Sequence, residues 1–168
     1  QHFVDPAGGF FDTADDAETL LVRPKDQSDN AAPSGTSAAA HALLTFAAVT
    51  GEEPYREAAI EAVRAGAGVA VGAARFAGWT LAAAEALLAG PLEVAVVGEP
   101  GDARDALHRA ALSLVSPGVA VVAGTPGTDL ALFEGRTLVA GQPAAYVCER
   151  FVCRTPITDP AQLLDTFD

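Results

Sequence analysis

The sequence predicts a mixed fold, in which helices come first and a small α/β module with a parallel β-α-β unit follows. Apolar residues recur at helical spacing through the first half of the chain. After Gly90 the pattern changes, and two short apolar runs at 92–97 and 119–123 flank an amphipathic stretch. Short apolar runs of this kind are typical of buried, parallel strands. We therefore expect two units, residues 1–90 and 91–168.

The first unit is expected to contain an irregular N-terminal stretch and three helices. Residues 18–22 are a candidate short strand within the irregular part. Ser34 or Thr36 can cap the first helix through a hydroxyl, and a glycine ends this helix after Thr50. Pro54 suits the first position of the second helix. Glycines 66, 68 and 72 are expected to fray the end of this helix, and a third helix is expected at 74–88.

The second unit is expected to contain the strands. A helix at 103–115 connects the two apolar runs, and such a β-α-β order implies a right-handed crossover between parallel strands. The remaining expected elements are short strands near 130–133 and 144–153, and a final helix at 161–167 that Asp159 caps.

Composition restricts the partners of this 168-residue chain. Its net charge is −12 and its predicted isoelectric point is 4.4. Because nucleic acid and anionic bilayers repel such a surface, neither is expected as a partner. The first residues contain neither a basic start nor an apolar core, so we expect no signal peptide. Two cysteines are too few for a disulfide scaffold, so a cytoplasmic location is expected. The chain begins with Gln, from which we expect a fragment of a longer protein.

Two motif classes are excluded by their spacing. The turn at 97–102 lacks a Gly-x-Gly-x-x-Gly pattern and contains two acidic residues where a pyrophosphate would bind, so no nucleotide cofactor is expected. The three histidines, His2, His41 and His108, have no partners at metal-ligand spacing, so no metal is expected.

Cys148 and Cys153 form a Cys-x4-Cys pattern, which is not the redox motif of thioredoxins. On one straight strand their side chains would face opposite sides, whereas a hairpin turning at 149–150 would bring them closer. Buried free thiols are the favoured interpretation. A disulfide or redox pair is the alternative.

The densest polar segment is the loop at 23–37, just before the first helix. Carboxylates here and in the preceding segment could serve as general acid and base on a sugar, and the candidates are Asp12, Asp15, Asp16, Asp26 and Asp29. Candidate ligand-binding residues are Lys25, Asn30, Ser34 and Phe11. Asp, Asn and Ser are also common in loops because they bond their own backbone, and this structural interpretation is favoured.

Several separated motifs resemble the C-terminal part of a known family. They are Gly8-Gly9-Phe10-Phe11-Asp12-Thr13, Arg23-Pro24-Lys25-Asp26, Asp29-Asn30-Ala31 with Pro33-Ser34-Gly35, Pro91-Leu92-Glu93-Val94, Ala145-Tyr146-Val147-Cys148 followed by Cys153, and Pro156-Ile157-Thr158-Asp159-Pro160. The family is that of the large thioredoxin-domain-containing proteins, bacterial relatives of the spermatogenesis-associated thioredoxin-domain protein.

The resemblance implies that residues 1–90 are the end of an (α/α) toroid, similar to that of N-acylglucosamine 2-epimerases and six-hairpin glycosidases. Residues 91–168 would be the terminal α/β module, and a thioredoxin-like domain would lie elsewhere in the parent protein. The implied partners are the rest of that polypeptide and, for the fragment, a second copy. Three functions follow as expectations: a fragment not catalytic alone, part of a carbohydrate-active site, or a docking module for the thioredoxin-like domain. Whether the chain is an enzyme stays open.

Overall fold

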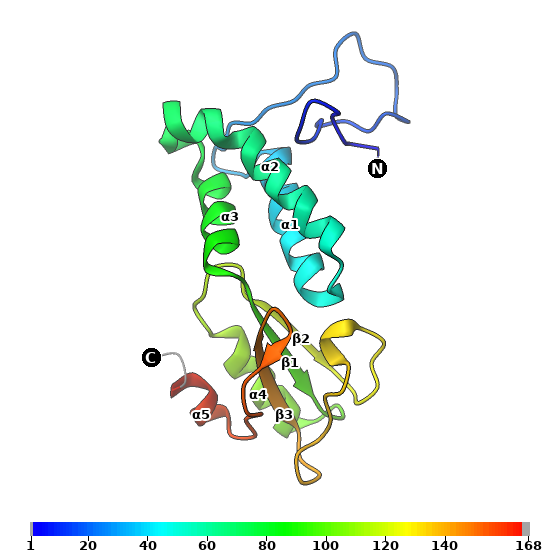
Figure 1. Cartoon of the computed structure of the whole chain (residues 1–168), viewed down its shortest axis with the longest axis vertical. Coiled ribbons are helices and arrows are strands. Elements are labelled where there is room, and N and C mark those ends of the chain that lie inside the picture. Colours follow the sequence, from blue (N-terminus) through cyan, green and yellow to red (C-terminus); the bar gives the residue numbers. More distant parts are fainter. Residues whose placement is uncertain (1, 166–168) are drawn as a thin grey trace. The chain divides into compact units, whose positions relative to one another are not determined.

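The computed structural model describes residues 2–165, over which helices combine with one four-stranded sheet (Figure 1). The chain divides into two compact units. The first contains the chain up to Leu44 together with Glu53–Ala89, and the second contains Thr45–Glu52 and the chain from Gly90 onward. The mixed helix-and-sheet class expected from the sequence is confirmed.

The helices of the first half follow the expected order. They are α1 (Gly35–Thr50), α2 (Glu53–Gly72), the 3-10 helix η1 (Ala74–Phe76) and α3 (Gly78–Ala89). Ser34 caps α1, because its Oγ accepts a hydrogen bond from the backbone N–H of Ser37 at 3.1 Å. None of the described helices combines the length and apolar character that a membrane crossing requires.

Alanine dominates the core of the first unit. Its buried members are Ala40, Leu44, Ala59, Ala62, Ala83 and Ala86. Small side chains let helices approach closely, and Gly66 is the extreme case, since an added Cβ would lie 2.7 Å from the Cγ2 of Thr80. Glycines 66, 68 and 72 are expected from the sequence to fray the end of α2, but the helix continues through Gly66 and Gly68 to Gly72.

Two local expectations for this unit are incorrect. Residues 18–22 form no strand and are exposed, so no neighbouring strand supplies the ladder that a β conformation needs. The third helix is interrupted at Ala77, which separates η1 from α3.

The sheet of the second unit has the order β2-β1-β3-β4. Its strands are β1 (Leu92–Val97), β2 (Ala120–Gly124), β3 (Ala144–Glu149) and β4 (Val152–Cys153). Strands β1 and β2 are parallel and α4 (Asp102–Leu112) connects them, so the predicted β-α-β unit is confirmed. Strand β3 pairs antiparallel with β1 on one side and with β4 on the other.

The two faces of the sheet are covered differently. Helices α4 and α5 (Pro160–Asp165) cover the face that carries Val94, Val96 and Val147 (Figure 1). Asp159 Oδ1 accepts from the N–H of Ala161 at 3.0 Å and so caps α5 as predicted. Residues 166 and 167 of the expected helix lie outside the described residues.

The opposite face carries Ala95 and Val97, and the 3-10 helix η2 (Ala131–Phe133) packs on it. A strand was expected near 130–133, and this is wrong. Leu132 and Phe133 are consecutive, yet both are buried in the same cluster. A strand would send neighbouring side chains to opposite faces, whereas a helical turn lets both pack inward.

Candidate functional site

A disulfide joins the last two strands of the sheet. Cys148 on β3 and Cys153 on β4 are direct register partners, and their sulfurs are bonded. The hairpin turns at Arg150 and Phe151, one residue later than expected, and both residues have positive φ angles of 49° and 63°. The favoured interpretation of free thiols is therefore wrong, because the hairpin returns Cys153 to the same face as Cys148.

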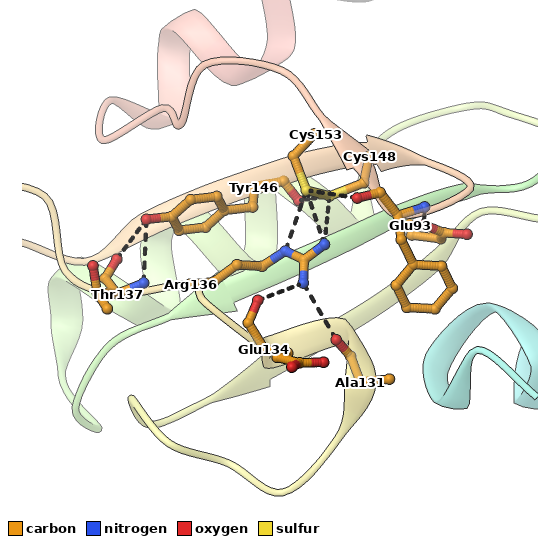
Figure 2. The surroundings of a disulfide bond; sticks show 9 residues. Glu93, Ala131, Glu134, Arg136, Thr137, Tyr146, Cys148 and Cys153 are labelled. Atoms are coloured by element: carbon orange, nitrogen blue, oxygen red, sulfur yellow. Dashed lines mark hydrogen bonds between the residues drawn. A yellow bond between two sulfur atoms is a disulfide. The ribbon is translucent and has the colours of Figure 1, made fainter.

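Arg136, which follows η2, places its guanidinium against both sulfurs (Figure 2). Its Nη2 lies 2.9 Å from the Sγ of Cys153 and 3.4 Å from the Sγ of Cys148, and its Nε lies 3.2 Å from the Sγ of Cys153. Its Nη1 donates to the carbonyls of Ala131 and Glu134 at 3.3 and 3.2 Å. The side chain is only 7% exposed, so a positive charge is held beside the disulfide by the backbone of its own loop.

A buried carboxyl group lies on the other side of Cys148. Glu93 on β1 is the register partner of Cys148 and is 3% exposed. Its Oε2 accepts a hydrogen bond from the N–H of Phe151 at 2.7 Å. Burial raises the pKa of Glu93, and the N–H of Phe151 and the charge of Arg136 oppose that rise.

The two sulfurs differ in access. Cys148 is 1% exposed, whereas Cys153 is partly exposed on the short outer strand. Residues 127–131 and 133–137 line a hollow of about 410 Å³, and Arg136 is the member of the cluster that takes part in this lining. An incoming sulfur nucleophile would therefore reach Cys153 first, and the thiolate released would be that of Cys148.

The polar loop provides a contrasting environment. Asp29 is 2% exposed, and its two carboxylate oxygens accept from the N–H of Ser34 (2.9 Å), the hydroxyl of Ser37 (2.6 Å) and the N–H of Thr80 (2.9 Å). Burial disfavours the charged form, but these hydrogen bonds outweigh it and lower the pKa of Asp29. Ser34, a ligand-binding candidate, is buried in the same network. Both residues therefore hold the loop to the helices.

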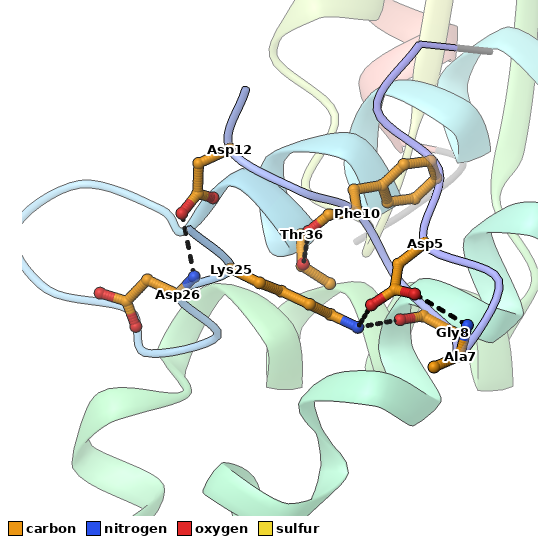
Figure 3. A network of polar contacts seen from close by, with 8 residues as sticks. All are labelled: Asp5, Ala7, Gly8, Phe10, Asp12, Lys25, Asp26 and Thr36. Carbon is orange, nitrogen blue, oxygen red and sulfur yellow. Dashed lines mark hydrogen bonds and ion pairs between the residues drawn. The ribbon is translucent and has the colours of Figure 1, made fainter. Parts of the chain in front are cut away.

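Lys25 extends away from Asp26 and toward the N-terminal turn (Figure 3). Its Nζ lies 2.8 Å from Oδ2 of Asp5 and also donates to the carbonyl of Gly8. The hydrogen bond from Lys25 lowers the pKa of Asp5. Asp5 was not among the sequence candidates, because it lies 20 residues from Lys25 and no local pattern links the two.

The other carboxylates of the loop serve mainly local contacts. Asp12 Oδ2 accepts from the N–H of Asp26 at 2.9 Å, and Asp26 Oδ1 accepts from the N–H of Ser28 at 2.8 Å (Figure 3 shows the first). Asn30 is exposed, and its N–H donates to the carbonyl of Ala32. The ring of Phe11 lies under the guanidinium of Arg23, 4.0 Å from its centroid.

Asp15 and Asp16 gather around His2, whose Nδ1 lies 2.7 and 3.6 Å from their carboxylates. The hydrogen bond from His2 lowers the pKa of Asp15. One ligand atom from each of the three lies within 4.8 Å of the others, and all three residues are exposed. Exposed acidic groups commonly gather in this way without an ion.

Sequence reasoning missed Glu93 and Arg136. A signal for Glu93 was present, since it is the one charged residue in the otherwise apolar run 92–97. Arg136 carries no such signal, because its partners are 12 and 17 residues away.

The site thus defined is a disulfide held between a buried guanidinium and a buried carboxyl group. No protein-family model matches the chain, and no curated protein sequence matches it significantly. The resemblance to thioredoxin-domain-containing proteins, which rests on motifs, stays a prediction.

Proposed function

We propose that the α/β unit carries a thiol–disulfide exchange site, in which the Cys148–Cys153 disulfide accepts two electrons from a dithiol. The observation that carries this proposal is the contact of the Arg136 guanidinium with both sulfurs. A neighbouring cation lowers the pKa of a thiol and makes it a better leaving group. A disulfide that serves only to tie two strands together needs no buried charge beside it.

The exchange proceeds in two displacements. A thiolate of the donor attacks the Sγ of Cys153, the bond between Cys153 and Cys148 breaks, and its electron pair goes to the Sγ of Cys148. The second thiolate of the donor then attacks the donor sulfur of this mixed disulfide. The donor leaves as a disulfide, Cys153 is released as a thiolate, and two protons complete the dithiol form.

A reducing compartment is consistent with this role. We propose a cytoplasmic location, where disulfides that form are usually transient and catalytic. The negative net charge of −12 disfavours nucleic acid and anionic membranes as partners.

The resemblance supplies a candidate donor. We propose that the chain is the C-terminal part of a thioredoxin-domain-containing protein and that α1, α2 and α3 are the last helices of its (α/α) toroid. The α/β unit would then dock the thioredoxin-like domain of the parent protein. The fragment would then be inactive alone, because the thioredoxin-like domain supplies the electrons. Exposed apolar side chains on α3, such as Leu81 and Leu88, are consistent with burial by the rest of that protein or by a second copy.

A carbohydrate-active site is less well supported. The alternative rests on the loop carboxylates, and Asp29 is closed inside its own network while Asp12 and Asp26 bond backbone N–H groups. Those contacts hold the loop together, whereas the disulfide cluster presents a partly exposed reactive atom.

The test is the rate at which dithiothreitol reduces the disulfide in the full chain, followed by mass spectrometry after acid quenching and alkylation. Arg136→Met is expected to slow the reaction about tenfold, because the leaving thiolate loses the cation that stabilises it. The reduction rate of Arg136→Lys should lie between those of the wild type and Arg136→Met. Arg109→Met removes an exposed arginine of α4 and is the matched control, expected to react at the wild-type rate.

Reaction with glutathione identifies the attacked sulfur. When the mixed disulfide is trapped at low pH, the glutathionyl group is expected on Cys153. Equal rates for wild type and both Arg136 variants would overturn the proposal, as would an adduct found mainly on Cys148.

A further inference from the structure

We infer that Glu93 exchanges the proton that accompanies opening and closing of the Cys148–Cys153 disulfide. This inference rests on the proposed exchange function and adds the residue that completes its chemistry.

The first support is the register of the sheet. Glu93 on β1, Cys148 on β3 and Cys153 on β4 are successive register partners, so they form a row across three neighbouring strands. Directly opposite residues on one face have Cβ atoms roughly 4.5–5.5 Å apart. The side chain of Glu93 therefore leaves its strand opposite Cys148, and its carboxyl group accepts the N–H of Phe151 in the hairpin turn (Figure 2).

The second support is burial. Cys148 is 1% exposed and Glu93 is 3% exposed, so bulk water does not reach the leaving sulfur directly. A thiolate formed there needs a proton donor inside the cluster. Glu93 is buried and is the register partner of Cys148, so its carboxyl group is our candidate for this donor.

The other polar groups of the cluster do not fill this role. Arg136 stays protonated and supplies charge, not a proton. Tyr146 faces the same side of the sheet, but its hydroxyl donates to the carbonyl of Thr137 at 2.7 Å. Glu149 and Arg150 are exposed at the hairpin end.

Charge balance favours the transfer. In the inferred cycle, the proton lies on Glu93 before reduction, and Arg136 supplies the positive charge of the cluster. When the proton moves from Glu93 to the Sγ of Cys148, the products are a neutral thiol and a carboxylate, whose charge the cation of Arg136 stabilises at a distance. Burial already raises the pKa of Glu93, so a protonated population persists nearer to neutral pH. On reoxidation the same carboxylate takes the proton back.

Glu93 also accepts the N–H of Phe151, which lies in the turn that carries Cys153. A merely structural role of Glu93 would act through this bond. Gln retains an oxygen acceptor for it, so Glu93→Gln removes the proton and keeps the hydrogen bond.

The experiment follows the rate of reduction of the full chain by dithiothreitol from pH 5.5 to 8.5, each rate divided by the thiolate fraction of the reagent. In the wild type this corrected rate is expected to fall as pH rises through the pKa of Glu93. Glu93→Gln should give a slower, flat profile, and Glu93→Asp should restore part of the inflection. Thermal melts of the oxidised variants identify any that do not fold.

A second readout does not depend on rates. In the infrared difference spectrum, reduced minus oxidised, we expect a negative band from the protonated carboxyl group of Glu93. The spectrum of Glu93→Gln should lack this band. If the wild type resists dithiothreitol altogether, the exchange function itself fails. If wild type and Glu93→Gln react with the same pH profile and show the same difference spectrum, only the role of Glu93 is overturned.

Discussion

The carboxylate of Asp29 accepts a hydrogen bond at 2.9 Å from the backbone N–H of Thr80, a residue 51 positions further along the chain. Thr80 lies in the first turn of α3, where backbone N–H groups have no partner within the helix. Asp29 thus satisfies a helix terminus from outside, and the same carboxylate holds Ser34 and Ser37 at the start of α1. The polar loop ties the beginnings of two helices together.

Asp29→Asn is expected to destabilise the protein by about 1.5–3 kcal/mol, the usual loss for a hydrogen bond to a buried charged group. The NH2 group of the new asparagine would face one of the N–H or O–H groups that now donate to the carboxylate of Asp29. Urea unfolding at pH 7 measures the change. Asp26→Asn, which alters an exposed carboxylate of the same loop, is the control and should change stability much less.

The effect of Asp29 should depend on pH in a defined direction. Its pKa is lowered in the folded state, so its stabilisation is fully present above the unfolded value of about 3.9. The advantage of wild type over Asp29→Asn should shrink as pH falls through the folded pKa. A difference that stays constant down to strongly acid pH would contradict this assignment.

Gly66 and Gly68 offer a matched pair within α2. Replacing a helical glycine with alanine normally stabilises by about 1 kcal/mol. Gly68→Ala should show this gain, since no atom outside its own helix and neighbours lies within 4 Å of the added Cβ. Gly66→Ala should instead destabilise, because the new Cβ would meet the Cγ2 of Thr80 at 2.7 Å.

Chemical denaturation of both glycine variants tests this contrast. Adding Thr80→Ser to Gly66→Ala removes the clashing methyl group and should recover part of the loss. Equal gains for both glycines would show that α2 and α3 are not in close contact there.

The hairpin turn contains a residue in an unfavourable conformation. Arg150 is exposed, is not glycine and has a φ of 49°. Asn tolerates this left-handed region better than other residues with a side chain. Arg150→Asn is therefore expected to stabilise the protein by about 0.5–1 kcal/mol.

Arg150→Ala controls for the loss of the arginine side chain, since alanine has the same difficulty at positive φ. The thermal unfolding temperature of Arg150→Asn should be higher than those of Arg150→Ala and the wild type. The prediction fails if the Ala variant gains as much as the Asn variant.

Local patterns predicted the elements whose causes are local. The run at 92–97, apolar except for Glu93, coincides with β1, because a strand buried on both faces favours apolar residues at nearly every position. Ser34 and Asp159 cap their helices as predicted, because a cap uses N–H groups two or three residues away. The segment 130–133 was misassigned because Leu132 and Phe133 fit either a strand or a helical turn until η2 packs on the sheet.

The candidate site was predicted only in part. The C-x4-C spacing indicated that a hairpin would bring Cys148 and Cys153 closer, but it could not decide between thiols and a disulfide. Among the polar-loop candidates, Asp29 and Ser34 bond within the loop and to the helices because those bonds satisfy buried backbone groups.

The sequence by itself determined the order of helices and strands, the parallel β-α-β unit and the unfavourable charge for nucleic acid, since these depend on composition and short-range spacing. The tertiary structure alone decided that Arg136 and Glu93 lie beside the disulfide and that Asp29 meets Thr80. These contacts join residues 12 to 55 positions apart on different elements. They form only when the sheet register and the helix packing bring the backbones together, so no local pattern encodes them.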